Sequence, residues 1–476
     1  MNGSLAIRGG RVLDPGRGLD TIADVLIEGG RIAAIGPGLA GSAPPTADVI
    51  EAEGLVVCPG FVDIHCHLRD PGFEHKETIE SGTRAAARGG FTTVCCMPNT
   101  EPPIDSQATV EYVLRTAAAV GLVRVLPIGC VSRGRHGEAL AELADLAEAG
   151  VVGFSDDGNP VTDGSLMRRA LEYSQALGLP VIDHCEEPSL TKEGVMHEGW
   201  VATRLGLRGQ PAAAEEATVA RDIALAEFTG SHVHIAHVST RGSVELVRAA
   251  KARGVNVTAE VTPHHLTLTH EAVAFSPACP AGRPADNDGL TYDTNAKVNP
   301  PLRTREDVEA CVEGLLDGAI DAIATDHAPH ALEDKLCEFD QAAFGISSFE
   351  TALGTLLTLV PKGPACRTGR RLDLPTLVAK LTAGPVAALG LDRPGRAPVW
   401  GRPGLDGLGS LAPGAPADVV VFDPQREWVV EPERFASKGR NTPLAGRTLR
   451  GQVVATVYGG RIVYTLEPAR TGTGTM

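Results

Sequence analysis

The sequence predicts a parallel α/β protein, a (β/α)8 TIM-like barrel joined to a small β-domain that both chain ends build together. Three observations support this prediction. Apolar strands and helices alternate about eight times through the middle of the chain. Both ends consist of short alternating strands joined by Gly-Gly turns. The length of 476 residues exceeds one ordinary domain but suits a large barrel with an appended domain.

The composition is typical of a soluble globular protein. Hydrophobic residues make up 43% of the chain and aromatic residues only 4%, so the core must rely on Leu, Val, Ile and Ala. The net charge of −16 disfavours nucleic acid and anionic membranes as partners. No apolar run approaches the roughly 18 residues of a membrane span, and residues 1–15 lack the order of a signal peptide. We therefore expect a cytoplasmic protein whose ten unpaired cysteines are reduced thiols.

The two chain ends share a style of sequence. The motif Gly-Gly-Arg followed by Val or Ile occurs at Gly9, Gly29 and Gly459, each time between alternating strand segments. We therefore expect residues 1–56 and 398–464 to fold into one composite β-sandwich domain. Residues 57–397 then form the barrel, and the polar residues 465–476 form a tail.

Strand–helix units fill the middle of the chain. An apolar run that begins at Gly54 and continues through Ile64 predicts one buried strand. Further strands are expected at 92–97, 124–128, 151–154, 180–182, 232–236, 256–261 and 322–325. Helices are expected at 106–119, 138–149, 164–177, 213–229, 242–253 and 305–314, the first with Ser106 as its cap. Residues 275–296 are rich in Pro, Gly, Ala and Asp without periodicity, which predicts a lid-like insertion after a strand end.

Metal-ligand side chains recur at the carboxyl ends of these strands. His65 and His67 lie two positions apart, so a strand directs both imidazoles to the same face. Alone, this pair is equally consistent with two structural histidines. The same position in other units is occupied by Asp157, His184, His237 and Asp326. A barrel brings these strand ends to one mouth, where imidazoles and carboxylates together suit Zn²⁺ or a similar ion.

Other candidates near these ligands are given structural roles. His232 and His234 share one face of their strand, whereas His237 lies on the other face at its end, so we expect the first two to be structural. Cys66 and Cys185 adjoin ligand histidines, but adjacent side chains in a strand face opposite ways, so we expect both to serve packing.

Several motifs together resemble one family. They are His65-Cys66-His67-Leu68-Arg69-Asp70-Pro71-Gly72, Met97-Pro98-Asn99-Thr100, Asp183-His184-Cys185-Glu186, His237-Val238-Ser239, Asn299-Pro300-Pro301-Leu302-Arg303 and Ala324-Thr325-Asp326-His327-Ala328-Pro329-His330. This set looks like a dihydroorotase of the longer bacterial, class I type, in the amidohydrolase superfamily, over nearly the whole chain. The resemblance implies a metal-dependent, reversible interconversion of L-dihydroorotate and N-carbamoyl-L-aspartate in pyrimidine (UMP) synthesis.

The metal bridge distinguishes the subtype. Many relatives bridge two metals with a carboxylated lysine, but no lysine occurs from Glu77 to His184 in this chain. The resembling class I enzymes use an aspartate, which corresponds to Asp157, because a carboxylate supplies two oxygens as a lysine carbamate does. Asp156 is then a neighbour that caps a turn. One or two zinc ions are expected.

The resemblance also implies roles around the substrate. Asp326 acts as a metal ligand and as general base, then acid, between the attacking water and the leaving ring nitrogen. Arg69 can bind the substrate carboxylate bidentately, joined by Asn99 and His330. Asn299 contacts the ring, and Phe344 and Gly345 contact the substrate through their backbone. His264, His265 and His327 receive no role.

Two alternatives stay open. Another cyclic amidase, hydantoinase- or allantoinase-like, is disfavoured by the missing lysine and by Arg69. A non-catalytic scaffold for aspartate carbamoyltransferase is disfavoured because the chain keeps the full inferred ligand set. A homo-oligomer is expected, and association with aspartate carbamoyltransferase is compatible with catalysis.

Overall fold

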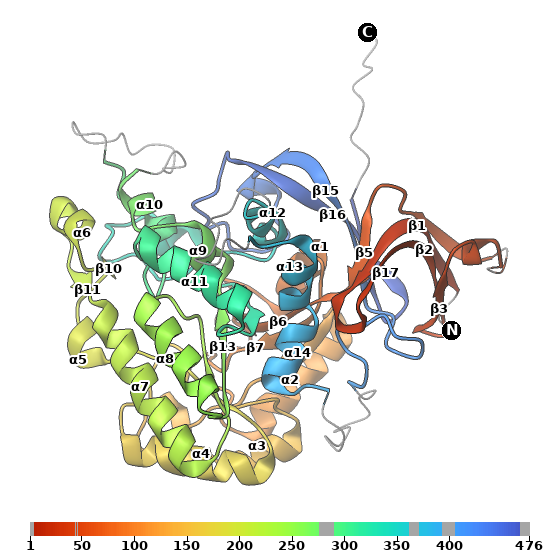
Figure 1. The fold of residues 1–476 in the computed structure, drawn as a ribbon. Helices are drawn as coiled ribbons and strands as arrows, with labels where there is room; N and C mark the ends of the chain where they lie inside the picture. The colour runs from red at the N-terminus through yellow and green to blue at the C-terminus, as the bar shows by residue number, and fades with distance from the viewer. Residues whose placement is uncertain are drawn as a thin grey trace.

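The structure, a computed structural model, describes residues 4–42, 44, 46–275, 290–360, 371–392 and 405–466. Its architecture is mixed α/β, as the alternation of strands and helices predicts (Figure 1). Within these ranges, no helix is both long and apolar enough to cross a membrane. Parts of each predicted segment fall outside the described residues: 1–3, 43, 45 and 398–404 of the β-domain, 361–370 and 393–397 of the barrel, 276–289 of its lid-like insertion, and 467–476 of the tail.

Strands from both ends of the chain share one eight-stranded sheet, red and blue in Figure 1. Its order is β17-β16-β15-β5-β1-β2-β3, and β4 also pairs with β1. The strands are β1 (Leu5–Asp14), β2 (Leu19–Glu28), β3 (Arg31–Gly36), β4 (Asp48–Glu51), β5 (Val56–Pro59), β15 (Val419–Val429), β16 (Thr448–Tyr458) and β17 (Arg461–Thr465). The pairing of β5 with both β1 and β15 joins the two ends at the centre of the sheet.

Two of the three Gly-Gly motifs form turns in this sheet, whereas the turn expected at Gly9 and Gly10 is wrong, because both residues lie inside β1 at an irregularity in its pairing with β2. Gly29 and Gly30 turn from β2 to β3 with φ of 57° and 79°, and Gly459 and Gly460 turn from β16 to β17 with φ of 55° and 77°. Two successive positive φ angles favour glycine in a tight hairpin. The two turns also pack together, because a Cβ on Gly460 would lie 2.8 Å from the Cα of Gly30. Ala417 links them, donating to Gly30 O and accepting from Gly460 N.

The single strand predicted from residue 54 onward is wrong. The structure has two strands, β5 and β6 (Phe61–Cys66), which belong to different sheets. They separate at Gly60, where a Cβ would lie 2.2 Å from Thr92 Oγ1, and Gly60 N donates to Asp418 O. Both strands are buried throughout, so an uninterrupted apolar run does not reveal where one ends.

The middle of the chain carries two parallel sheets, ordered β6-β7-β8 and β14-β13-β12-β9. Their other strands are β7 (Phe91–Cys96), β8 (Arg124–Pro127), β9 (Val181–Asp183), β12 (Val233–Ile235), β13 (Val257–Val261) and β14 (Ala322–Ile323), and a small separate sheet holds β10 (Met196–His197) and β11 (Gly209–Gln210). The strand predicted at 151–154 is reduced to Phe154, which bridges Gly129 and Val181 between the two sheets. On the other side, Cys66 pairs with His327 beyond β14.

Along the chain, most helices lie between these strands, and in space they pack around the parallel sheets (Figure 1). They are α1 (Ile79–Arg88), α2 (Gln107–Val120), α3 (Leu143–Ala149), α4 (Gly164–Leu177), α5 (Pro188–Thr191), α6 (Trp200–Leu205), α7 (Ala212–Thr229), α8 (Arg241–Ala252), α9 (Pro263–Thr267), α10 (Glu271–Ala274), α11 (Arg305–Asp317), α12 (Ala352–Leu357), α13 (Leu374–Leu381) and α14 (Ala383–Leu389). Ser106 caps α2 as predicted, accepting from Thr109 N. The predicted helix from 138 begins only at Leu143, because the backbone of 139–141 pairs with that of 131–133 instead.

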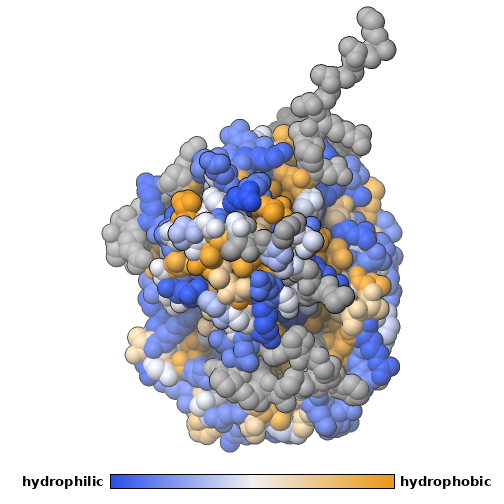
Figure 2. Space-filling view, turned by 90° about the vertical axis from the view of Figure 1, so that its right-hand side faces the viewer, coloured by the Kyte–Doolittle hydropathy of each residue, from blue (hydrophilic) through white to orange (hydrophobic). Residues whose placement is uncertain are grey.

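The core is aliphatic, as the composition predicts, with a few aromatic contacts between layers. Phe61 of β6 lies 5.6 Å from Phe91 and 6.3 Å from Phe422 of β15, measured between ring centroids, so one core joins the parallel strands to the chain-end sheet. The side of the molecule that carries the chain-end sheet mixes hydrophilic and hydrophobic residues (Figure 2). Ile22 and Ile462 of this sheet are exposed.

Candidate active site

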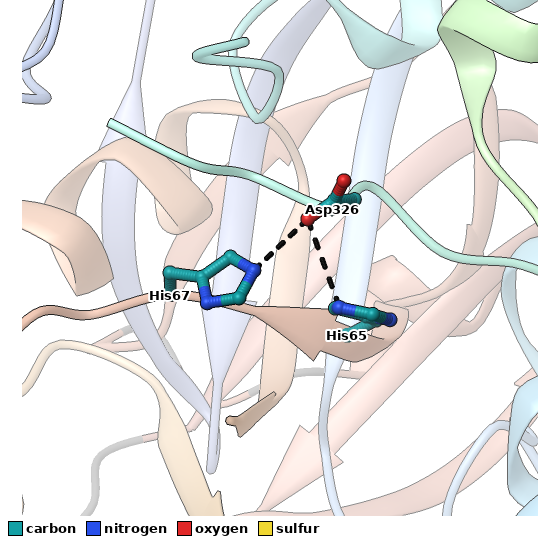
Figure 3. Close-up of side chains that lie close together, drawn as sticks. All are labelled: His65, His67 and Asp326. Atoms are coloured by element: carbon teal, nitrogen blue, oxygen red, sulfur yellow. Dashed lines mark hydrogen bonds and ion pairs between the residues drawn. The ribbon is translucent and has the colours of Figure 1, made fainter. Parts of the chain in front are cut away.

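Six buried side chains at strand ends meet at one point. They are His65, His67, Asp157, His184, His237 and Asp326. In Figure 3 the rings of His65 and His67 both face the carboxylate of Asp326. Its Oδ1 lies 3.0 Å from His67 Nε2 and 3.6 Å from His65 Nε2. His65 on β6 and His67, the residue just after β6, thus keep the strand period of two, and both imidazoles face one centre.

Asp157 lies in the middle of the four histidines. Its Oδ1 lies 3.4 Å from His65 Nε2 and 3.7 Å from both His184 Nδ1 and His237 Nε2. Its Oδ2 lies 3.7 Å from His67 Nε2. The two oxygens of one carboxylate thus face two different sets of imidazoles. The adjacent Asp156 turns away and accepts hydrogen bonds from the backbone of Val131 and Ser132.

The donor atoms fit a metal ion. Within the described ranges, His65 Nε2 and Asp157 Oδ1 are buried and have no hydrogen-bond partner. A buried polar atom without a partner is costly, and a cation between these lone pairs would remove that cost. At this centre, two triads can hold an ion with ligand atoms within 4.8 Å of one another: His65, His67 and Asp326, and His65, Asp157 and His237. Imidazole nitrogens with carboxylate oxygens are a donor set of borderline metals such as zinc.

Backbone strain gathers at the same place. Arg69, His237 and Asp326 have φ angles of 62°, 33° and 44°, in the left-handed region that side chains rarely adopt. A residue keeps such a strained backbone conformation only where its surrounding contacts hold it there, and such residues cluster at functional sites. Asp326 is fixed through its neighbour, because Thr325 donates to Asp63 of β6 through its backbone N–H and its hydroxyl.

The charges of the site are strongly coupled. Burial would raise the pKa of Asp157, but the adjacent imidazoles, His65 foremost, hold it well below its usual range. Burial would lower the pKa of His184, yet Asp157 and Glu186 raise it to about 10. Burial would also raise the pKa of Asp326, and His67 outweighs that effect. Both carboxylates are therefore ionised at neutral pH and available as ligands or as a base.

Three of the four histidines have their second ring nitrogen held by another side chain. His65 Nδ1 lies 2.7 Å from Glu260 Oε1, and His184 Nε2 lies 3.1 Å from Glu186 Oε2. His67 Nδ1 lies 2.9 Å from Asn99 Oδ1.

Glu260 and Glu186 have no role predicted from the sequence. A sequence signal existed for Glu260, a single charge inside the otherwise apolar end of strand β13. Glu186 stands two positions after His184, in one of the quoted motifs, but its spacing alone did not identify a partner. Glu186 also accepts from Asn299 Nδ2 at 2.6 Å.

A cavity of about 220 Å³ opens beside this cluster. All six residues expected at the substrate line it: Arg69, Asn99, Asn299, His330, Phe344 and Gly345. His67, Asp157, His184, His237 and Asp326 also line it, whereas His65 lies beneath. A larger cavity of about 750 Å³ lies elsewhere, against β15 and β16, and contains none of the expected residues.

The cationic side of the cavity is built around Arg69. Its Nη2 lies 3.4 Å from His330 Nε2, and its Nε donates to Pro329 O at 3.3 Å. His330 Nε2 in turn donates to Phe344 O at 2.8 Å. Gly345 has a φ of 144°, and a Cβ there would lie 2.7 Å from Ala328 Cβ, so only glycine fits this position without a shift.

The three histidines without an expected role do not line this cavity. His327 Nδ1 accepts from Ser348 N at 3.0 Å, and His265 Nε2 donates to Pro300 O at 3.0 Å, so both brace backbone segments. His264 is buried, and burial lowers its pKa well below the usual value.

Comparison with known proteins gives consistent matches. Residues 54–243 match a family model described as dihydro-orotase-like, and residues 317–464 match the amidohydrolase family. A dihydroorotase of Geobacter metallireducens is 48% identical over 461 residues, covering 97% of this chain and 99% of the relative. A dihydroorotase of Pelotomaculum thermopropionicum is 52% identical over 460 residues, covering 96% of this chain and 98% of the relative.

Solved structures agree with the fold. An L-hydantoinase (dihydropyrimidinase) from Arthrobacter aurescens superposes with a TM-score of 0.79 at 25% identity, covering 98% of both chains. A D-hydantoinase (dihydropyrimidinase) from a Thermus species gives a TM-score of 0.77 at 25% identity, covering 98% of this chain and 97% of the other.

Proposed function

The chain belongs to the dihydroorotase family of amidohydrolases, and from that premise we propose which of its residues perform the reaction. It is a metal-dependent cyclic amide hydrolase that interconverts L-dihydroorotate and N-carbamoyl-L-aspartate in pyrimidine biosynthesis. The observation that carries the residue assignment is the position of Asp157 among four histidines, beside a small cavity with an arginine at its edge.

We propose that the parallel strands form a closed barrel and that the chain-end sheet is a separate composite domain. Backbone hydrogen bonds around Phe154 support closure on one side, since Val152 N donates to Pro127 O and Phe154 N to Pro180 O, both at 3.0 Å. On the other side, His67 N donates to His327 O at 2.9 Å. Shared pairing of β5 with β1 and β15 supports the composite domain.

The proposed metal site would hold one or two zinc ions; its ligands fall into two sets, as two ions would require. His65, His67 and Asp326 would bind one ion, and His184 and His237 the other, with Asp157 between them. Asp157 Oδ2 faces His67 of the first set, and Oδ1 faces His184 and His237 of the second set as well as His65. One carboxylate therefore contacts both sets, which supports a bridging role without a carboxylated lysine. When bound, the metal lowers the pKa of a water from about 15.7 towards 7 and polarises the scissile carbonyl.

Asp326 is the proposed general base and acid. It stands beside the other proposed ligands and lines the cavity, where a substrate and an attacking water would lie next to its carboxylate. In hydrolysis its carboxylate takes a proton from the attacking water and passes that proton to the nitrogen as the amide bond breaks. In ring closure the same two transfers run in reverse.

Arg69 is proposed to bind the substrate carboxylate, with His330 and Asn99 beside it. Asn99 also bonds His67, so it would orient a ligand as well as contact the substrate. Asn299 lies beside His184 and would contact the ring of the substrate from that side. The backbone of Phe344 and Gly345 is proposed to contact the substrate from another part of the cavity wall.

The experiment that tests this function is hydrolysis of L-dihydroorotate by the purified chain, with metal content measured on the same sample. Turnover should disappear on chelation and return with zinc, whereas dihydrouracil and hydantoin should not be hydrolysed. Turnover of hydantoin at a comparable rate would favour the hydantoinase-like alternative. Protein that binds no metal and turns over no substrate would favour the scaffold alternative.

We also propose a homo-oligomer, which the exposed apolar side chains of the chain-end sheet support. Light scattering on the purified chain tests this. If metal is bound but turnover is absent, addition of aspartate carbamoyltransferase tests whether activity depends on that partner.

A further inference from the structure

A line of buried polar side chains runs from the metal site into the space between the parallel strands. His65 Nδ1 lies 2.7 Å from Glu260 Oε1, and Glu260 Oε2 lies 3.2 Å from His234 Nε2. His234 Nδ1 lies 2.8 Å from Thr258 Oγ1, which also lies 2.8 Å from His232 Nε2. The line joins three strands, β6, β13 and β12, and it accounts for the two histidines that the sequence marked as structural.

Strand geometry explains why these side chains meet. His234 stands directly opposite Thr258 in the parallel register of β12 and β13. Glu260 lies two residues after Thr258 on β13, so its side chain points to the same face of the sheet. It is closer to the carboxyl end of β13, and His65 lies at the corresponding end of β6.

Glu260 cannot act on the substrate directly. Its side chain is completely buried, and it does not line the cavity. Among the described residues, its ion pairs are with His65 and His234 and with no lysine or arginine. A buried carboxylate of this kind is costly unless it is hydrogen-bonded to groups that need its charge.

The contact determines which nitrogen of His65 is free. When Nδ1–H donates to Glu260, the lone pair lies on Nε2, the atom that faces Asp157 and Asp326 at 3.4 and 3.6 Å. The carboxylate also raises the basicity of the imidazole as a ligand. His67 is held by a neutral amide instead, and Glu186 behind His184 is partly exposed at 18% of its side chain. Behind His65 the supporting charge is fully buried.

We propose that Glu260 is a positioning residue for His65 and that His234 holds Glu260 in place. Together they fix the tautomer and the ring orientation of one metal ligand from behind. The inference rests on the metal site of the proposed function, and it concerns metal affinity and geometry rather than contact with substrate.

Glu260→Gln tests the proposal because it keeps the shape and removes the charge. The amide oxygen can still accept from His65, and His234 can accept from the amide after changing tautomer. The zinc dissociation constant, measured by competition with a chromogenic chelator, should rise about 10- to 100-fold. In the Co²⁺-substituted protein the visible absorption spectrum should shift. At saturating metal, kcat should fall while KM for dihydroorotate stays unchanged.

Two further variants separate positioning from general destabilisation. His234→Gln leaves the Glu260 charge but weakens its support, so zinc affinity should fall less than in Glu260→Gln. Glu350→Gln changes another carboxylate, one whose side chain is 5% exposed and pairs with Arg88 away from the metal site. All variants are compared at pH 8, where Glu350 is mostly ionised because burial raises its pKa to about 7, and this change should leave zinc affinity and the Co²⁺ spectrum unchanged. If Glu260→Gln does not fold, His234→Gln carries the test, since unchanged zinc affinity and an unchanged Co²⁺ spectrum there would overturn the proposal.

The possible failures are distinguishable. Wild-type protein that binds no divalent metal would refute the proposed function itself. Wild-type protein that binds zinc, together with a Glu260→Gln variant of equal affinity and identical Co²⁺ spectrum, would refute only the positioning role. Equal losses in Glu260→Gln and Glu350→Gln would also overturn the proposal, because they would show a general effect of removing a buried charge.

Discussion

Replacing Asp326 with Asn isolates its proposed role in proton transfer. The amide has the shape of the carboxylate and can still accept a hydrogen bond, but it cannot take a proton at neutral pH. Asparagine also tolerates the positive φ of 44° at this position better than alanine does. The variant should therefore fold, and loss of the general base should be its main effect on the reaction.

The expected loss follows from the role. General acid–base catalysis contributes about 10²- to 10⁴-fold, which corresponds to about 2.7–5.4 kcal/mol of transition-state stabilisation. Asp326 lies 3.0 Å from His67 Nε2, and this neighbour holds its pKa below the usual range against the effect of burial. The carboxylate is thus ionised across neutral pH, and the loss should be similar from pH 6 to 9.

The assay follows both directions of the reaction at saturating zinc, with metal content measured on each sample. A catalyst cannot change an equilibrium constant, so hydrolysis and ring closure should lose the same factor. Asp321→Asn is a matched control, because Asp321 precedes the same strand and pairs with Lys251 outside the cavity. A metal-loaded Asp326→Asn enzyme that retains more than about a tenth of wild-type kcat would refute the assignment.

Three further predictions concern other parts of the molecule. Arg69→Lys keeps the charge but loses the bidentate fork, so KM for dihydroorotate should rise about tenfold; an unchanged KM in steady-state kinetics would contradict carboxylate binding by Arg69. Gly345→Ala would bring a Cβ within 2.7 Å of Ala328 Cβ, so it should lower the free energy of unfolding in denaturant by about 1–3 kcal/mol and raise KM. Gly164→Ala is the control, because a Cβ there has nothing within 4 Å, and it should change neither quantity. Burial raises the pKa of Glu350 from 4.5 to about 7, so the folded state keeps a proton that the unfolded state loses between these values, and stability falls as pH rises through this window. Glu350→Gln should therefore gain about 3 kcal/mol relative to wild type between pH 4.5 and 8 in unfolding titrations, and a pH-independent difference would contradict the shift.

Local pattern was sufficient for much of this molecule. The alternation of strands and helices predicts the mixed α/β architecture, and the Gly-Gly motifs at Gly29 and Gly459 predict the hairpins at both ends. The same pattern puts His65, His67 and Asp326 at strand ends. These features depend on residues close in sequence, through the period of two in strands and the positive φ of glycine, and so the sequence alone contains them.

Contacts between distant segments determined the rest. The division at Gly60 depends on Thr92, on β7, and on Asp418, the residue just before β15. Glu260 meets His65 across 195 positions of sequence, and Asn99 meets His67 across 32. The two-residue period of a strand and the propensities of its residues predict on which face a side chain lies. They do not predict which other strand lies opposite that face. The support behind the proposed metal ligands therefore emerged only when the strands were assembled, because hydrogen-bond partners are set by distance in space rather than along the chain.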